Sequence, residues 1–290
     1  MKISIVTPSF NQAVYLEDGM LSVLSQKCAD LEYIVVDGGS TDGSAEIVAR
    51  HADRLGWWVS EPDGGQYDAI NKGFAHSTGE VMGWMNSDDK LTPWALSVVE
   101  EIFETLPEVQ WITSLAQIRW DAKGRAVRCL PHRGFSRKGF LAGENLPRDG
   151  AFSTGWIQQE STFWRRSLWE RAGGGVGAGF RLAGDFDLWA RFFKHAELVG
   201  VETPLGGFRF HGEQKTGSGH ARYLEEAERV LTECGGRRHG SALRELRRLA
   251  QESCPRGLRA LAGRSGFLYP APICRHDRKA SKWRLLANWN

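Results

Sequence analysis

The 290-residue chain lacks the marks of several protein classes. No run reaches the roughly 18 apolar residues of a candidate transmembrane helix, so we expect no membrane-spanning segment. The apolar start of the chain is also too short for a signal peptide. Its five cysteines are widely spread and form no CxxC pair, which argues against a disulfide framework or a zinc site and favours the reducing cytoplasm.

What is present indicates a folded globular protein. Hydrophobic residues make up 41% of the chain and charged residues 25%, which excludes a disordered polymer. The 12 tryptophans are unusual, because each offers a flat apolar face and one N–H donor. We expect most of them to pack in the core.

The net charge of +2 hides an uneven distribution. Residues 237–290 carry 13 Lys/Arg and 3 Asp/Glu, a net charge of +10, so the other 236 residues carry 24 basic and 32 acidic groups, a net charge of −8. A basic tail on an acidic body suggests contact with an anionic surface, with membrane lipid favoured over nucleic acid. The alternative is a solvated helical face.

The first 107 residues alternate between strand and helix patterns. Short buried strands are predicted at residues 2–7, 32–37, 57–60 and 81–85, each followed by a helical pattern. This alternation predicts an α/β fold with a mostly parallel central sheet and helices on both faces. Polar residues follow the carboxyl end of each strand, where open α/β sheets bind ligands. We therefore interpret residues 1–107 as a nucleotide-binding half.

Residues 108–220 show shorter strands and helices, and residues 221–290 read as a basic helical C-terminal extension. Amphipathic helices are predicted at residues 222–231 and 242–251. We therefore expect one domain over residues 1–220, followed by the extension.

Two acidic sites follow buried strands. Adjacent carboxylates such as Asp88 and Asp89 repel each other unless a cation or N–H donors compensate them, and Mg²⁺ or Mn²⁺ bridging to a diphosphate would do so. The alternative is a helix cap. Asp37 could accept a hydrogen bond from a uracil or thymine imide or a ribose hydroxyl, or simply stabilise its own loop.

Taken together, the motifs resemble those of the family 2 glycosyltransferases, which have the GT-A fold. The resemblance covers roughly residues 1–215 and rests on four strings in the family's order: VTPSFN at 6–11, VVDGGSTDGS at 35–44, EPDGGQYDAINKG at 61–73 and NSDD at 86–89. It implies an enzyme that transfers a sugar from a nucleotide-sugar donor to an acceptor hydroxyl.

The resemblance also implies roles in donor binding. Residues that match Thr7, Pro8 and Asn11 line the nucleotide pocket in the family, and the match of Asp37 binds the base. The matches of four further residues approach the nucleotide or diphosphate: Asp63, Gly65, Tyr67 and Asn71.

Ser87, Asp88 and Asp89 match the family's metal-binding motif, often written Asp-x-Asp. In the family the last Asp usually contacts the metal and the preceding one the ribose or sugar. Some relatives use a His at the position of His211 as a further metal or diphosphate ligand, although a structural role is an alternative. The resemblance thus implies Mn²⁺ or Mg²⁺ as cofactor.

Two strings in the second half, QESTFWRR at 159–166 and GDFDLW at 184–189, resemble the acceptor-side segments of the family. The acid that matches Asp185 is the general base there. Asp187 lies two residues further along a predicted helix and should point elsewhere. Trp156 and Trp189 are candidates for stacking on sugar rings, with core packing preferred for Trp189.

The sequence thus predicts a metal-dependent, inverting hexosyltransferase that uses a nucleotide-sugar, with UDP-sugars favoured. We expect it to build a cell-surface polysaccharide or glycolipid on a glycan or lipid-linked acceptor, at the inner face of the membrane. The alternatives are a nucleotidyltransferase, which would want basic residues in the loop at 8–12, and a non-catalytic sugar- or lipid-binding module.

Overall fold

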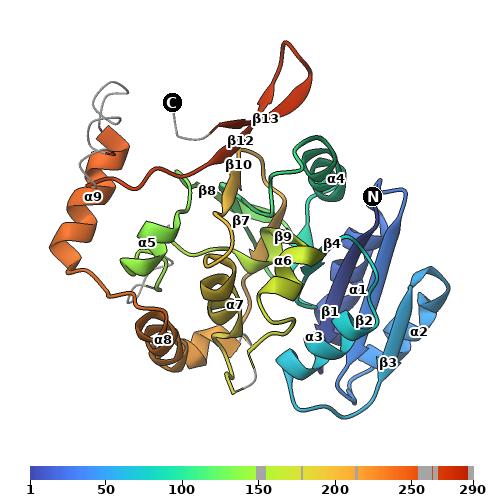
Figure 1. Cartoon of the computed structure of the whole chain (residues 1–290). Coiled ribbons are helices and arrows are strands. Elements are labelled where there is room, and N and C mark those ends of the chain that lie inside the picture. The colour runs from blue at the N-terminus through green and yellow to red at the C-terminus, as the bar shows by residue number, and fades with distance from the viewer. Residues whose placement is uncertain (148–154, 178, 213–214, 254–262, 264–266, 287–290) are drawn as a thin grey trace.

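The computed structural model describes residues 1–147, 155–177, 179–212, 215–253, 263 and 267–286. A large central sheet runs through the molecule with helices on both sides (Figure 1). Its strands, in spatial order, are β13 (Lys282–Leu286), β12 (Ile273–Asp277), β10 (Val199–Val201), β6 (Trp111–Ser114), β9 (Thr162–Arg165), β4 (Val81–Trp84), β1 (Ile3–Ser9), β2 (Leu31–Asp37) and β3 (Trp57–Ser60).

The sheet is mostly parallel, as the strand–helix alternation predicts. β1 pairs in parallel with both β2 and β4, and β2 pairs in parallel with β3. β9 breaks the pattern, because it runs antiparallel to its neighbours β4 and β6. β1 is covered on both faces, and all seven of its residues are buried, including the polar Ser4, Thr7 and Ser9.

A smaller sheet lies beside the first. Its spatial order is β5 (Lys90–Leu91), β11 (Gly206–Arg209), β7 (Ala116–Trp120) and β8 (Ala126–Pro131). β11 pairs antiparallel with β5 and parallel with β7. This sheet therefore ties the chain that follows β4 to residues more than a hundred positions later.

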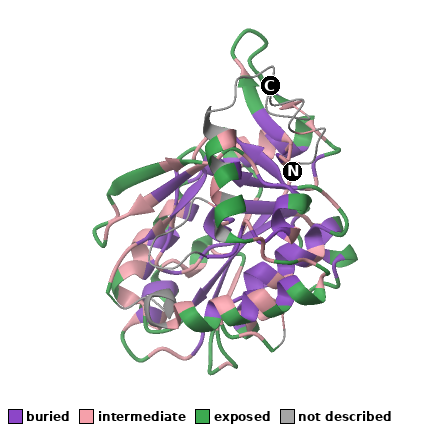
Figure 2. Cartoon of the chain, turned by 90° about the vertical axis from the view of Figure 1, so that its left-hand side faces the viewer, coloured by how far each residue is buried: buried purple, intermediate pink, exposed green. Residues whose placement is uncertain are grey.

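Two apolar clusters, one on each face of the central sheet, form the core. The helices that contribute to one cluster are α1 (Ala13–Leu24), α2 (Ser44–Arg50) and α4 (Ala95–Thr105). Those that contribute to the other are α3 (Gln66–Ala75), α5 (Arg137–Leu141), α6 (Arg166–Arg171), α7 (Gly184–Phe192) and α8 (Lys215–Glu233). The remaining helices are α9 (Ser241–Ser253) and the single turns η1 (Ala52–Arg54) and η2 (Gln159–Ser161). Figure 2 shows the buried strands inside this shell.

The tryptophans support the prediction of core packing. Trp84, Trp111, Trp164 and Trp189 are all nearly inaccessible, and the Trp189 ring stacks on the Trp84 ring with centroids 5.9 Å apart. Trp189 is therefore a core residue.

The C-terminal extension is only partly helical. The predicted helices are present as α8 and α9, but β12 and β13 form a hairpin whose first strand pairs in parallel with β10. The sequence did not predict this hairpin, because apolar and polar residues alternate only weakly along its two strands. α8 begins at Lys215, so it runs across the proposed boundary at residue 220, which stays a prediction. No helix in the described residues is both long and apolar enough to cross a bilayer.

Candidate active site

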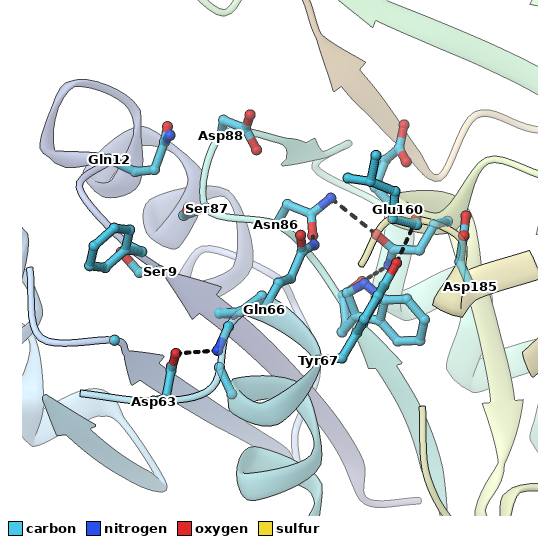
Figure 3. Close-up of a pocket in the computed structure, with 18 of the residues that line it drawn as sticks. Ser9, Gln12, Asp63, Gln66, Tyr67, Asn86, Ser87, Asp88, Glu160 and Asp185 are labelled. Atoms are coloured by element: carbon cyan, nitrogen blue, oxygen red, sulfur yellow. Dashed lines mark hydrogen bonds between the residues drawn. The ribbon is translucent and has the colours of Figure 1, made fainter. Parts of the chain in front are cut away.

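A cleft of about 410 Å³ opens at the carboxyl ends of β1, β2 and β4, a size common for small-molecule sites. The parallel strands end there together, so the polar residues that follow them meet, as predicted. Its lining includes residues of all four N-terminal strings, among them Pro8, Ser9, Gly38, Asp63, Gly65, Tyr67, Asn86, Ser87 and Asp88. Later segments also contribute, among them Trp156, Glu160, Asp185 and Tyr223, and Figure 3 shows part of this lining.

The loop before α3 is shaped by its own side chains. The Asp63 carboxylate accepts a hydrogen bond from the backbone N–H of Gly65 at 2.7 Å. Gly65 has a φ of +114°, which residues with a side chain rarely adopt. This bond fixes the conformation of a loop that lines the cleft, where the sequence predicts nucleotide or diphosphate contact.

Three of the four residues predicted for the nucleotide pocket and the base, Thr7, Asn11 and Asp37, are not among the lining residues. Asp37 is fully buried and accepts hydrogen bonds from the Ser40 N–H at 2.9 Å and the Ser60 hydroxyl at 2.7 Å. Thr7 accepts one from the Tyr33 hydroxyl at 3.0 Å. Their contact with a nucleotide stays a prediction.

Asn11 is the third of these residues. It adopts a φ of +51°, a left-handed conformation that asparagine tolerates better than most residues. Its side-chain oxygen accepts a hydrogen bond from the Thr41 N–H at 3.0 Å. Asn11 thereby joins the loop after β1 to the loop after β2.

Asn71 connects α3 to the loop before α7 through two hydrogen bonds. Its amide nitrogen donates to the Val176 carbonyl at 3.1 Å, and its amide oxygen accepts from the Val176 N–H at 2.8 Å. Both polar groups of the side chain are thus engaged by the glycine-rich loop before α7.

The acidic pair is divided between two environments. Asp88 lines the cleft, and its Oδ2 lies 3.0 Å from Nε2 of His211. Asp89 is fully buried and accepts hydrogen bonds from the Arg209 N–H at 2.8 Å and the Asn86 amide at 3.1 Å. Asp88 therefore lines the cleft and Asp89 does not, and the predicted division of metal and sugar contacts between the two stays a prediction.

A divalent cation would find two protein ligands here. Asp88 and His211 offer one carboxylate and one imidazole, and Mg²⁺ or Mn²⁺ takes few protein ligands when phosphate oxygens and water complete its shell. In the part of the chain that the structure describes, no group of three or more His, Cys, Asp or Glu side chains is placed to hold a metal ion. The donor set suits a cation shared with a diphosphate.

Asp185 lies at the start of α7, in the same cleft. Burial raises the pKa of its carboxyl to about 6, against the opposing effect of hydrogen bonds from the Phe186 N–H and the Tyr223 hydroxyl. The Tyr223 hydroxyl lies 3.1 Å from Oδ1 and 3.2 Å from Oδ2. Asp187 points elsewhere, as predicted, and pairs with Arg191 at 3.0 Å.

Tyr67 links α3 to the start of α7. Its hydroxyl donates to the Leu182 carbonyl at 2.6 Å and accepts from the Gly184 N–H at 2.9 Å. Any side chain at Gly184 would collide with the Tyr67 ring, because a Cβ there would lie 2.6 Å from Cζ. The glycine therefore permits this close contact beside Asp185.

Sequence reasoning missed two groups that shape the site. Tyr223 and Glu226 come from α8, in the segment expected to be an appendage, and no local pattern marks them. Glu226 accepts hydrogen bonds from the N–H groups of Leu182 at 2.9 Å and Ala183 at 3.0 Å, at the start of α7. Trp156, the candidate for stacking on a sugar ring, stacks on Tyr223 with ring centroids 5.1 Å apart.

Glu160 was also missed as a site residue, although it lies inside a string that carries the resemblance. It lines the cleft and is only 4% exposed. Burial raises the pKa of its carboxyl to about 8, and repulsion from Asp88 and Asp185 adds to the effect.

Comparison with known proteins gives two similarities in sequence. Residues 4–153 match the sequence model of the family described as "Glycosyl transferase family 2". An uncharacterised glycosyltransferase of Mycobacterium tuberculosis is 28% identical over 242 residues, which cover 81% of this chain and 87% of that protein.

Two solved structures share the fold. TarS 1–349 of S. aureus, in complex with UDP-GlcNAc, superposes with a TM-score of 0.63 at 15% identity, covering 92% of this chain and 78% of that one. The mannosyltransferase PcManGT of Pyrobaculum calidifontis, in complex with GDP-Man and Mn²⁺, has a TM-score of 0.54 at 17% identity, with coverage of 91% and 79%.

Proposed function

The chain belongs to glycosyl transferase family 2, and from that membership we propose that its cleft transfers a sugar from a nucleotide-sugar to an acceptor hydroxyl with inversion at the anomeric carbon. The observation that carries the proposal is the pairing of two acids in one cleft. Asp88, beside His211, lies at one part of the lining and the buried Asp185 at another.

The donor side is formed by the strand ends of the nucleotide-binding half. We propose a UDP-sugar, in which Asp37 contacts the base and the loop of Asp63 and Gly65 approaches the diphosphate. Support comes from structures of the same fold bound to UDP-GlcNAc and to GDP-Man. GDP-sugars are the second donor class to test.

The leaving group is a nucleoside diphosphate, whose charge must be stabilised as it departs. Asp88 and His211 would hold a Mn²⁺ or Mg²⁺ ion against the diphosphate, and such an ion neutralises the charge that develops on the leaving oxygens. Asp89 helps to position Asp88, because its carboxylate accepts hydrogen bonds from Asn86 and from the Arg209 N–H.

Asp185 acts as the general base. An acceptor hydroxyl is a poor nucleophile until its proton is removed, and a base with a pKa near the working pH does this efficiently. The pKa of Asp185, at about 6, leaves the group ionised at pH 7. Tyr223 orients the carboxylate through its two contacts.

The test replaces Asp185 by Asn. Transfer from a panel of UDP- and GDP-sugars, with Mn²⁺ present, should fall by about 100- to 10,000-fold, the usual contribution of a general base. Nucleotide affinity, measured by calorimetry, should stay within about twofold because the nucleotide does not contact Asp185.

Asp187→Asn is the matched control, since this Asp pairs with Arg191 outside the cleft. Turnover of Asp185→Asn close to that of the wild type would remove Asp185 from the base role. Release of inorganic diphosphate from nucleoside triphosphates would instead favour the nucleotidyltransferase alternative, which the absence of basic residues at 8–12 already disfavours.

For the acceptor, we propose a glycan or lipid-linked molecule met at a membrane surface. α9 supports this, because Leu243, Leu246 and Leu249 are exposed on it at helical spacing, within the basic segment 237–290. Arg247 does not add to the basic surface, because it is buried against the Tyr269 ring.

A further inference from the structure

Glu160 occupies a single turn, η2, that its neighbours fix in place. The side-chain amide of Gln158 donates to a β7 carbonyl at 2.9 Å, and that of Gln159 donates to the last carbonyl of β4. The Ser161 hydroxyl donates to the first carbonyl of β11 at 3.0 Å. Three elements therefore hold η2 through the residues on either side of Glu160.

The Glu160 carboxyl, by contrast, has unused hydrogen-bonding capacity. It is 4% exposed, and within the described residues its Oε1 has no hydrogen-bond partner. An unpartnered buried polar atom destabilises the folded state, so its retention in a rigid turn calls for an explanation. Since Glu160 lines the cleft, a ligand could supply the partner.

The position of Glu160 indicates which part of the ligand would supply this hydrogen-bond partner. It interacts electrostatically with both Asp88 and Asp185, and Figure 3 draws all three around the same cleft. On the proposed function, Asp88 marks the diphosphate and Asp185 the acceptor hydroxyl. The group that joins these two is the transferred sugar, which carries several hydroxyl donors.

We propose that Glu160 binds a hydroxyl group of the transferred sugar through Oε1 and so helps to select the donor sugar. A site built to hydrogen-bond a substrate hydroxyl discriminates strongly, because a sugar that does not present the hydroxyl leaves the buried carboxyl unpaired. The proposal rests on the proposed function, since it assumes a nucleotide-sugar in this cleft.

The test compares affinities of the full chain for UDP and GDP with those for UDP-glucose, UDP-galactose, UDP-GlcNAc and GDP-mannose, by calorimetry with Mn²⁺. Glu160→Ala should bind the preferred nucleotide-sugar about tenfold more weakly, a typical effect of one lost hydrogen bond, and the free nucleotide within about twofold. Glu160→Gln retains an acceptor oxygen and should recover at least about half of the lost affinity.

Glu170→Ala, at an exposed position on α6, is the matched control and should bind like the wild type. Equal weakening of nucleotide and nucleotide-sugar by Glu160→Ala would assign Glu160 to the fold and overturn the inference, as would unchanged affinity for both. A wild-type chain that binds none of these ligands would overturn the proposed donor and the inference with it. Weaker binding of the nucleotide-sugar by Glu160→Ala, with unchanged affinity for the nucleotide, supports both the proposed donor and the role of Glu160.

Discussion

Two buried carboxyls in one cleft illustrate how position sets chemistry at the scale of single residues. The pKa of Asp185 rises to about 6 and that of Glu160 to about 8, in both cases chiefly through burial. At pH 7 the first is mostly ionised and the second mostly protonated. This difference supports the proposal that Asp185 is the base and that Glu160 pairs with a neutral hydroxyl.

The burial of Asp185 predicts a cost in stability that depends on pH. Raising a carboxyl pKa from 3.8 to about 6 corresponds to about 3 kcal/mol. Because the folded state holds the proton more tightly, this cost is absent below pH 3.8, grows as pH rises and is complete above about pH 6. Asp185→Asn, which stays neutral, should therefore be more stable than the wild type at pH 7.5.

Denaturant unfolding at pH 7.5 and pH 4 checks this prediction. The variant should gain about 1–3 kcal/mol at pH 7.5 and much less at pH 4. A gain of the same size at both pH values, or a loss at pH 7.5, would show that ionised Asp185 is not destabilising.

At the scale of elements, the start of α7 depends on α8. Backbone N–H groups at a helix N-terminus have no partner within the helix. Here the Glu226 carboxylate accepts hydrogen bonds from the N–H groups of Leu182 and Ala183. Burial alone would raise the pKa of Glu226, but these backbone donors and Arg222 outweigh burial and lower it. One acid on α8 thereby fixes the segment that carries Asp185.

Glu226→Ala should leave these N–H groups unpaired and displace α7. We expect the free energy of unfolding to fall by about 2–3 kcal/mol, and kcat to fall more than donor KM rises, because Asp185 moves while the nucleotide side stays. Glu225→Ala changes an exposed neighbour and is the control. Equal stability and kcat in the two variants would contradict the capping role.

At the scale of the whole molecule, the C-terminal segment is part of the fold. Cys274 of β12 is fully buried and Trp283 of β13 nearly so, and both belong to the core cluster shared with β1 and α4. Deleting residues 237–290 would therefore remove core as well as surface. A test of membrane contact needs point substitutions on α9 instead.

The exposed leucines of α9 provide that test. The triple variant Leu243→Ser, Leu246→Ser and Leu249→Ser should bind vesicles containing anionic lipid at least about tenfold more weakly than the wild type, because apolar burial in the interface is lost. Co-sedimentation measures the effect. Val127→Ser, at an exposed position on β8, controls for a general loss of surface apolarity. Undiminished binding of the triple variant would contradict the proposed contact.

The sequence by itself determined the family, the parallel pairing of the N-terminal strands and most of the cleft lining. This was possible because short-range patterns carry that information: buried strands end in polar residues, and parallel strands bring those ends to one edge. Pro8, Asp63, Tyr67, Asp88 and Asp185 all line the cleft where the motifs predicted.

Only the tertiary structure decided which of two adjacent acids faces the cleft and which distant residues complete it. Local sequence patterns do not distinguish Asp88 from Asp89. The structure does, because the backbone N–H of Arg209 in β11 donates a hydrogen bond to the Asp89 carboxylate. Tyr223 reaches Asp185 from 38 positions away. Three elements hold the turn η2, which places in the cleft a carboxyl whose Oε1 has no hydrogen-bond partner within the described residues. Burial and hydrogen-bond partners depend on packing between distant segments, which no local pattern records.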